Sequence, residues 1–513
     1  MGREDQRLLS AGYSLTCLAR TGAKQQAMAS SQAVNTLLRR SLLLGGMEAL
    51  MRIPLILAAG FLARRLGSVD YGQWTVVLAF HGLVFSVASL GLSSALSRYA
   101  AGVTLERALG MLLFALGSCL AMLGILAVPI LGFNFVLAAV LGLSPAAAVL
   151  IKCGLLLVLA QIAESLLDAY FKARELIARQ AFFQLLRTAV DVIVILAVFS
   201  HISPDAPEQH IAALVAFIGI AVAAKVVLYP LLLVGAGHGA QTPDAATRHN
   251  MYRLGLPVVP AAMLLALIYQ EDRLILSQLV EPQALGVYAL AATVAMYLHS
   301  VGTLAYAMLL PRLSRFYDRG SESEVGELMN ASQRLFLQLM GPVLVCLALL
   351  GKEFVVVLAG PSYAPAGSLL LILGLGVAVD RLFGPYELIF FLVGRSYWAT
   401  VINALSCLTV AVGVTLGAQS GDAFGAACGM VTAVVCNNLL RAYASRCFIP
   451  LGPTPVLWRA ILLTIIAIML AVVLANYLEL LGRLFLATLA ILYAARMLLR
   501  TLRGDSKAIH RAA

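Results

Sequence analysis

Residues 71–95, YGQWTVVLAFHGLVFSVASLGLSSA, decide the fold class because they form an apolar run long enough to cross a lipid bilayer. The run contains no Asp, Glu, Lys or Arg. A bilayer-crossing helix needs about 20 mostly apolar residues. The sequence therefore predicts a transmembrane helix at this position.

The same pattern recurs along the whole chain. Of its 513 residues, 61% are hydrophobic and only 12% are charged, whereas roughly a quarter of the residues of a soluble protein are charged. This composition leaves too little polar surface to cover a soluble globule. We therefore predict an all-α polytopic membrane protein. Its fourteen expected spans lie at residues 42–64, 71–95, 108–131, 146–170, 180–200, 211–235, 254–279, 284–310, 332–350, 366–393, 397–418, 422–447, 455–476 and 481–500.

The distribution of Lys and Arg among the loops predicts the orientation of the chain. With a cytoplasmic N-terminus, fifteen basic residues fall in inward-facing loops, Arg441 among them, and four fall in outward-facing loops. An excess of Lys and Arg in short cytoplasmic loops is the usual determinant of topology. We therefore expect both termini in the cytoplasm. The net charge of +11 follows from topology and does not indicate nucleic-acid binding.

Two segments of the chain repeat each other. Gly72 opens the second span and Arg98 closes it, while Gly286 and Arg312 do the same for the eighth, at an offset of 214 residues. Duplicated halves with a site between them are common in secondary transporters. The predicted domains are a cytoplasmic tail (1–40), an N-lobe with spans one to six (41–235), a cytoplasmic linker (236–253), a pseudo-symmetric C-lobe with spans seven to twelve (254–447), the additional spans thirteen and fourteen (448–500) and a second cytoplasmic tail (501–513).

Several function classes are disfavoured by what the sequence does not contain. No connecting loop is long enough to form the extramembrane domain in which membrane glycosyltransferases, polymerases and ligases carry their catalytic groups. The sequence has no Walker motif for ATP hydrolysis and no cluster of metal-ligand residues. The eight cysteines lack CxxC spacing and do not form a disulfide framework. We therefore expect no enzyme, no metal and no cofactor.

Charged residues inside the expected spans mark the candidate site, because an ionisable group in hydrocarbon costs several kcal/mol unless it faces water or a partner. The stretch 267–276, LIYQEDRLIL, places three such groups together. Two other pairs are spaced four residues apart, Glu48 with Arg52 and Arg187 with Asp191, and fit self-neutralising helix contacts as well as a cavity. Lys225 has no partner in its own span. This density of charge suits a polar cargo or a lipid with a large polar head.

Further motifs resemble those of bacterial oligosaccharide flippases, the polysaccharide transporter branch of the multidrug/oligosaccharidyl-lipid/polysaccharide (MOP) exporter superfamily. The first is a turn with Leu66, Gly67, Asp70, Tyr71 and Gly72, followed by a helix that ends in GLSSALSRY (91–99). The others are Asp272 with the Gly286–Tyr288 turn, the Pro311–Arg312 helix end, and GDAFGAACG at 421–429. The resemblance extends over about residues 40–500.

The resemblance implies a protein that moves undecaprenyl-diphosphate-linked oligosaccharide across the bacterial inner membrane, for O-antigen, exopolysaccharide or capsule synthesis. Two lobes would rock around a charged central cavity that holds the glycan, while the lipid tail stays in the bilayer. Coupling to H⁺ or Na⁺ is implied as well. A polymerase and a chain-length regulator of the same pathway would be its protein partners.

Three alternatives remain open at this point. Lipid II flippases resemble one another through arginines in spans one, two and eight, whereas this chain has Arg52 in span one and none inside the other two. Drug antiporters of the same superfamily usually have twelve spans and fewer internal charges. A polysaccharide polymerase or ligase would need a long outward loop with paired carboxylates or arginines.

Eight residues form the predicted site. We expect four bases to contact pyrophosphate or acidic sugar, since a guanidinium binds phosphate oxygens in bidentate fashion. Four acids are expected to serve ion coupling or gating. Asp272 should face the cavity while Glu271 or Arg273 contacts a neighbouring helix, because adjacent residues lie 100° apart around a helix. The bases are Arg52, Arg187, Lys225 and Arg273, and the acids are Glu164, Asp191, Asp272 and Asp380.

Overall fold

The computed structural model describes residues 51–203, 206–233, 239–299, 302, 306, 309–449 and 454–502, and all regular structure in these residues is helical. The expected tail at 1–40, Glu48 and residues 503–513 lie outside the described part. The helices are α2 (Leu92–Tyr99), α3 (Leu105–Gly132), α4 (Asn134–Val140), α5 (Ala148–Ala173), α6 (Ile177–Phe199), α7 (Pro207–Leu231), α8 (Ala245–Gly255), α9 (Val258–Leu279), α10 (Pro282–Tyr297), α12 (Leu309–Asp318), α13 (Glu322–Ala359), η1 (Pro361–Tyr363), α14 (Ala366–Phe383), α15 (Pro385–Leu392), α16 (Tyr397–Arg446), α17 (Pro455–Tyr477) and α18 (Leu480–Leu502).

Eleven helices among the described residues are long and apolar enough to cross a membrane. Two of them each contain two expected spans. The helix Met51–Ala88 is interrupted at Gly67, where φ is +71°, and α16 is interrupted at Gly421 and Asp422. The expected eighth span begins as α10 and continues partly outside the described residues. The all-α polytopic fold is confirmed, while the count of fourteen stays a prediction.

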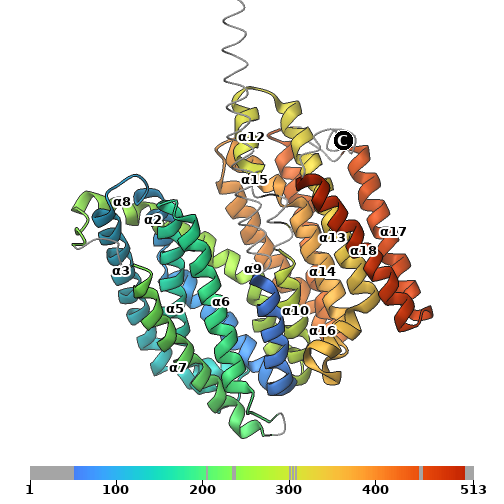
Figure 1. Ribbon diagram of the computed structural model, residues 1–513, viewed down its shortest axis with the longest axis horizontal. Helices are drawn as coiled ribbons and strands as arrows, with labels where there is room; N and C mark the ends of the chain where they lie inside the picture. Colours follow the sequence, from blue (N-terminus) through green and yellow to red (C-terminus); the bar gives the residue numbers. More distant parts are fainter. Residues whose placement is uncertain are drawn as a thin grey trace, which may run out of the picture.

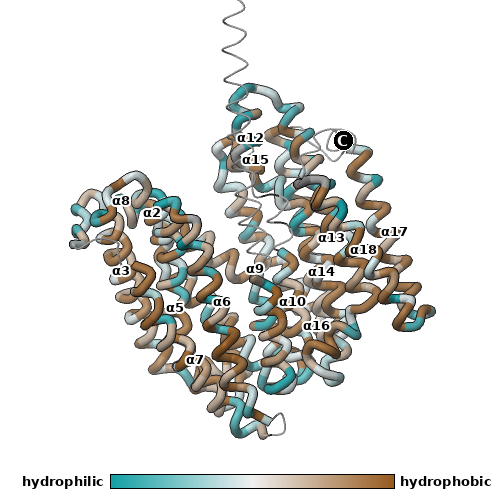
Figure 2. Tube along the Cα trace, viewed as in Figure 1, coloured by the Kyte–Doolittle hydropathy of each residue, from teal (hydrophilic) through white to brown (hydrophobic). Residues whose placement is uncertain are grey.

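The helices form two groups that spread apart toward one end of the molecule (Figure 1). We call α2 to α8 the N-terminal bundle and α9 to α18 the C-terminal bundle. The end that carries α2, α8 and α12 is called the inner end, because the basic loops predicted to be cytoplasmic lie there. Hydrophilic residues gather at the two ends, and a hydrophobic band lies between them (Figure 2). This distribution is the one expected of a multi-pass membrane protein.

Two features differ from the predicted domain organisation. The expected linker contains the helix α8, which leads almost directly into α9. The first expected span packs against the C-terminal bundle, because the Tyr363 hydroxyl donates a hydrogen bond to the Ala63 carbonyl over 3.1 Å. The second half of the same helix packs on the N-terminal bundle, where Trp74 meets Phe217 edge to face. This helix therefore connects the two bundles.

Glycines allow the two bundles to touch. A Cβ atom on Gly286 would lie 1.7 Å from the Ser68 carbonyl oxygen, and one on Gly72 would lie 3.0 Å from the Gly286 nitrogen. A similar contact lies within the N-terminal bundle, toward the inner end, where a Cβ on Gly91 would lie 2.3 Å from the Gly255 carbonyl oxygen. Gly72 and Gly286 are the pair related by the offset of 214 residues. The duplication of the two halves stays a prediction.

The sequence GDAFGAACG also has a packing role. It begins the second arm of α16, which folds back on the first arm at Gly421 and Asp422. A Cβ on Gly425 would lie 2.2 Å from the Gly417 carbonyl oxygen, and one on Gly429 would lie 2.0 Å from that of Gly413. Small residues of this kind let membrane helices approach closely. The motif therefore fixes the tight pairing of the eleventh and twelfth expected spans.

Candidate functional site

The N-terminal bundle buries a charged cluster at the contact of three helices. The Lys225 ammonium on α7 lies 2.8 Å from Glu164 Oε1 on α5 and 2.7 Å from Asp191 Oδ1 on α6. Arg187 on α6 lies 3.6 Å from Glu164 Oε2, and the Tyr229 hydroxyl donates to Glu164 Oε1 over 2.8 Å. Lys225 is only 6% exposed and Glu164 only 8%. Lys225, which has no acidic partner in its own span, therefore pairs with acids from two other helices.

This pairing could not be read from spacing along one helix. Arg187 and Asp191 are four residues apart, yet one contacts Glu164 and the other contacts Lys225. Asp168 is neutralised separately by Lys172, four residues further along the same helix, over 2.6 Å. The cluster therefore holds two bases and two acids, and its charges are matched within the bundle.

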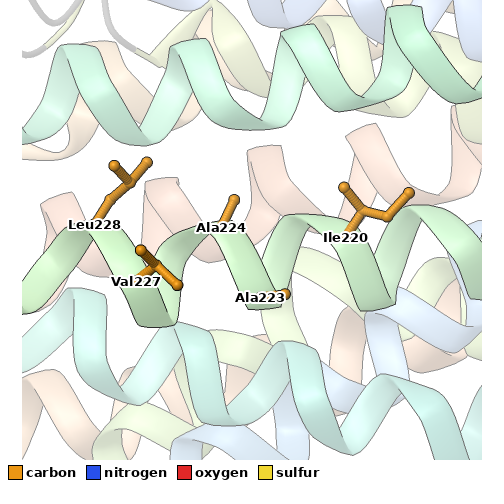
Figure 3. Close-up of a pocket in the computed structure, with 5 residues that line it drawn as sticks. All are labelled: Ile220, Ala223, Ala224, Val227 and Leu228. Atoms are coloured by element: carbon orange, nitrogen blue, oxygen red, sulfur yellow. The ribbon is translucent and has the colours of Figure 1, made fainter.

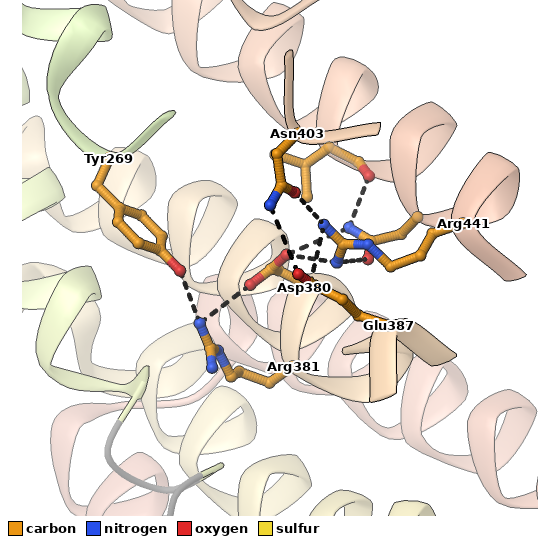
Figure 4. A network of polar contacts seen from close by, with 8 residues as sticks. Tyr269, Asp380, Arg381, Glu387, Asn403 and Arg441 are labelled. Atoms are coloured by element: carbon orange, nitrogen blue, oxygen red, sulfur yellow. Dashed lines mark hydrogen bonds and ion pairs between the residues drawn. The ribbon is translucent and has the colours of Figure 1, made fainter. Parts of the chain in front are cut away.

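A second network lies in the C-terminal bundle (Figure 4). Arg441 on α16 lies 3.6 Å from Asp380 Oδ1 on α14 and 3.6 Å from Glu387 Oε2 on α15. It also donates hydrogen bonds to the side-chain carbonyls of Asn438 and Asn403. Counting Arg441 among the inward loop residues was wrong, because its side chain is buried and paired inside the bundle. The run of polar residues Asn437, Asn438 and Arg441 within one span was the signal that could have revealed it.

The stretch LIYQEDRLIL lies in α9, on the face of the C-terminal bundle. Asp272 is 2% exposed and accepts a hydrogen bond from the Tyr288 hydroxyl of α10 over 2.9 Å. Arg273 is half-buried, donates to the Thr293 hydroxyl of α10 over 3.4 Å, and leaves its Nε without a partner. Glu271 is buried, and its Oε1 has no hydrogen-bond partner. The three consecutive charges therefore have three different environments.

A small cavity with a largely apolar wall brings several of these residues together. It has a volume of about 70 Å³, enough for one or two water molecules. The structure thus places three of the eight predicted site residues around one space. Its polar and charged lining consists of Tyr269, Asp272, Arg273, His299 and Asp380.

The remaining predicted base lies where the bundles meet. The guanidinium carbon of Arg52 lies 5.8 Å from the centre of the Tyr297 ring on α10. Arg52 belongs to the first expected span and Tyr297 to α10, so this contact joins that span to the C-terminal bundle.

A larger pocket, of about 510 Å³, lies along α7 and is unrelated to these charges (Figure 3). Ile220 is 50% exposed and Val227 is 66% exposed there. No polar group lines this pocket, so it suits lipid rather than a polar cargo. Its lining residues are Ile220, Ala223, Ala224, Val227 and Leu228. Among the residues that the structure describes, no group of His, Cys, Asp and Glu is placed to hold a metal ion.

Known structures share this fold. A lipid II flippase, MurJ, in an inward closed conformation matches with a TM-score of 0.68 and 12% identity, over 90% of this chain and 99% of its own. An inward-facing multidrug resistance MATE family transporter of the MOP superfamily matches with a TM-score of 0.63 and 13% identity, over 78% of this chain and 98% of its own. A MOP superfamily transporter from Pyrococcus furiosus matches with a TM-score of 0.51 and 13% identity, over 81% and 96% of the two chains. At these identities, the matches show the fold alone.

Sequence comparison gives the family. No curated protein matches the chain. The model of a family described as polysaccharide biosynthesis protein matches residues 37–317, which is more than half of the chain. With the fold of MOP superfamily transporters and charged groups buried in both bundles, the chain belongs to the polysaccharide biosynthesis protein family.

Proposed function

We propose that this protein is a flippase for lipid-linked oligosaccharides, which moves undecaprenyl-diphosphate-linked repeat units across the bacterial inner membrane for O-antigen, exopolysaccharide or capsule synthesis. The observation that carries the proposal is the burial of charged groups between apolar helices in both bundles of a polysaccharide biosynthesis family member. A glycan head with a diphosphate needs such a polar path. Its polyprenyl tail needs only the apolar outer surfaces of the bundles.

Arg273 is the strongest candidate for contact with the diphosphate. In the described part of the chain, no carboxylate lies within ion-pair distance of its guanidinium, which donates to Thr293 and retains an unpartnered Nε. A guanidinium in this state can bind phosphate oxygens in bidentate fashion. Arg52, beside Tyr297, would add a second positive charge at the meeting of the bundles. Arg187 and Lys225 are weaker candidates for substrate contact than Arg273, because each is already paired with Glu164.

The acids would control the conformational change of the protein rather than bind the substrate. Alternating access requires the bundles to separate at the outer end and to approach at the inner end. Asp191 and Glu164 hold Lys225, while Asp380 holds Arg441 and Arg381, so each network can exchange partners when a proton or Na⁺ neutralises one acid. Asp272 would act similarly through its hydrogen bond with Tyr288. The spread of the bundles toward the inner end supports an inward-facing state of this cycle (Figure 1).

Deletion of the gene tests the function directly. We expect full-length lipid-linked repeat units to accumulate in the cytoplasmic leaflet, and surface polysaccharide to disappear until the gene is restored. Their leaflet can be determined by their resistance to glycosidase added outside spheroplasts. If the deletion strain exports single repeat units that fail to polymerise, the protein is a polymerase instead. If the gene restores lipid II transport in a strain that lacks its own lipid II flippase, the protein is a lipid II flippase.

Replacement of Arg273 by Ala is expected to reduce translocation of lipid-linked glycan by about tenfold or more, because a hydrogen bond to a charged group contributes roughly 1.5–3 kcal/mol. Arg273→Lys should restore only part of the activity, since an ammonium cannot bind phosphate in bidentate fashion. Arg483→Ala is the matched control, because Arg483 pairs with Glu353 near the outer end of the C-terminal bundle, away from the charged networks. Equal translocation by Arg273→Ala and the wild type, at equal expression, would remove Arg273 from the site.

A further inference from the structure

A buried histidine joins two segments at the outer end of the N-terminal bundle. His210 lies in the first turn of α7 and is 1% exposed. Its Nδ1 lies 2.6 Å from Asp70 Oδ2, and its Nε2 lies 3.2 Å from the Ser203 carbonyl oxygen. Asp70 belongs to the turn that joins the first two expected spans, 140 residues earlier in the chain. The imidazole therefore fixes this turn to α7.

Both ring nitrogens of His210 face oxygen acceptors. A neutral imidazole has one N–H donor and one bare nitrogen, so it can satisfy only one of two acceptors. A carboxylate and a peptide carbonyl both require a donor. The two contacts form together when the ring is an imidazolium, which also pairs its charge with that of Asp70. The two contacts together therefore favour the imidazolium form of the ring.

The turn that His210 fixes lies in the helix Met51–Ala88 that connects the two bundles, and it contacts the C-terminal bundle. The Ser68 carbonyl packs against Gly286. The Tyr71 ring meets the Tyr363 ring edge to face, with 6.3 Å between their centres. Gly67, with φ of +71°, begins the turn and lets it change direction without a side-chain clash. Displacement of this turn would separate the bundles at their outer contact.

We propose that His210 is a proton-operated latch, which holds the turn 67–72 firmly in its closing position when it is protonated from the outer compartment. When it loses that proton, the ring keeps only one of its two hydrogen bonds and no charge to pair with Asp70, so its hold on the turn weakens. This inference rests on the proposed flippase cycle, because only an alternating-access protein needs its outer contact to open. Acidic conditions outside would keep the exit closed. Histidine suits this role since its ordinary titration, near pH 6.5, falls in the physiological range.

The other charged groups near the latch do not replace its partner. Arg65 donates to the Ile202 carbonyl over 3.2 Å and lies on the same helix as Asp70. His201 and Glu208 are exposed at the surface, and Tyr363 faces the turn from the C-terminal bundle. Within the described residues, Asp70 is the acid at ion-pair distance from His210. Asp70 is 21% exposed, so a proton can reach the pair from solvent at the outer end.

The test measures the outer contact without substrate. Spin labels at Val69, in the turn, and Ser368, near the start of α14, report the distance between the two bundles in nanodiscs by double electron–electron resonance. Both positions are exposed, and the native cysteines are replaced by serine. Between about pH 5.5 and pH 8, we expect the population with long distances to increase by about threefold or more.

Three variants decide the outcome. His210→Gln can still donate to Asp70 but cannot titrate in this range, so its distance distribution should be independent of pH. Asp70→Asn should also abolish the pH response, whereas His201→Gln, a surface histidine two residues before Ser203, should retain it. A pH response that persists in His210→Gln would overturn the latch, as would no response in the parent protein. The distance measurement contains no substrate, so it tests the latch separately from transport. If the latch fails but the protein still translocates glycan, the proposed function stands.

Discussion

Replacing Lys225 by Met is expected to destabilise the protein by about 3–5 kcal/mol, the largest effect of any single substitution proposed for this chain. Lys225 neutralises both Glu164 and Asp191 at 2.8 and 2.7 Å. Removal of the ammonium leaves two acids without their shared cation, and Arg187, 3.6 Å from Glu164, can compensate only partly. The thermal unfolding midpoint of the purified protein in detergent, compared with that of the wild type, measures this loss.

Lys152→Met is a matched control, which separates the loss of a buried ion pair from the loss of a lysine charge. Lys152 also lies within an apolar helix, but it is exposed at the outer end and contacts the Phe135 ring rather than an acid. Lys152→Met should therefore change the unfolding midpoint little. Similar losses for Lys152→Met and Lys225→Met would contradict a specific role for the buried cluster.

The triple variant Lys225→Met, Glu164→Gln and Asp191→Asn distinguishes a structural cluster from a functional one. Neutralising the two acids removes the uncompensated buried charges that Lys225→Met leaves, and Arg187, which loses Glu164, has a side chain that is 35% exposed to solvent. Most of the lost stability should therefore return. If the acids serve gating, however, glycan translocation should remain absent although the protein is folded. A triple variant that is stable and fully active would show that the cluster only holds the bundle together.

Replacing Gly286 by Ala is the second prediction with a large effect. The added methyl group would lie 1.7 Å from the Ser68 carbonyl oxygen, which is backbone and cannot rotate away. Overpacking of this kind costs typically 1–3 kcal/mol, which corresponds to about a 5- to 150-fold shift of a two-state equilibrium. Because the clash exists only while the bundles touch here, the shift should favour the state that is open at the outer end.

The spin-label pair Val69 and Ser368 can measure this shift directly. Gly286→Ala should lengthen the distance at every pH, and glycan translocation should fall because the exit no longer closes. Gly117→Ala is the control, since a Cβ atom on Gly117 meets nothing within 4 Å. An unchanged distance distribution in Gly286→Ala would mean that the turn and α10 adjust without separating the bundles.

Much of the fold was predictable from local sequence. Apolar runs of sufficient length identify transmembrane helices because the bilayer sets their length, whatever surrounds them. The repeat at an offset of 214 residues predicts equivalent positions for Gly72 and Gly286, and the structure brings the two residues into contact. The first expected span was harder to place. Its hydrophobicity gives no indication that it packs against Tyr363 of the C-terminal bundle.

The candidate site was predictable only in part. Lys225 was singled out because it has no partner in its own span, and it pairs with acids from two other helices. Arg441 was missed because it lies close to the end of its span, where a basic residue normally indicates topology. Its partners, Asp380 and Glu387, come from α14 and α15, and nothing in the spacing of α16 predicts them.

The sequence by itself determined that this protein is an all-helical membrane protein with charges inside its spans, because hydrophobic length and the cost of burying charge are local properties. Only the tertiary structure decided which charges neutralise one another, that the Arg273 guanidinium has no carboxylate partner among the described residues, and that His210 reaches Asp70. These outcomes depend on the rotation of each helix about its axis and on its neighbours. Both are set by packing between segments distant in the chain, such as Gly286 against Ser68.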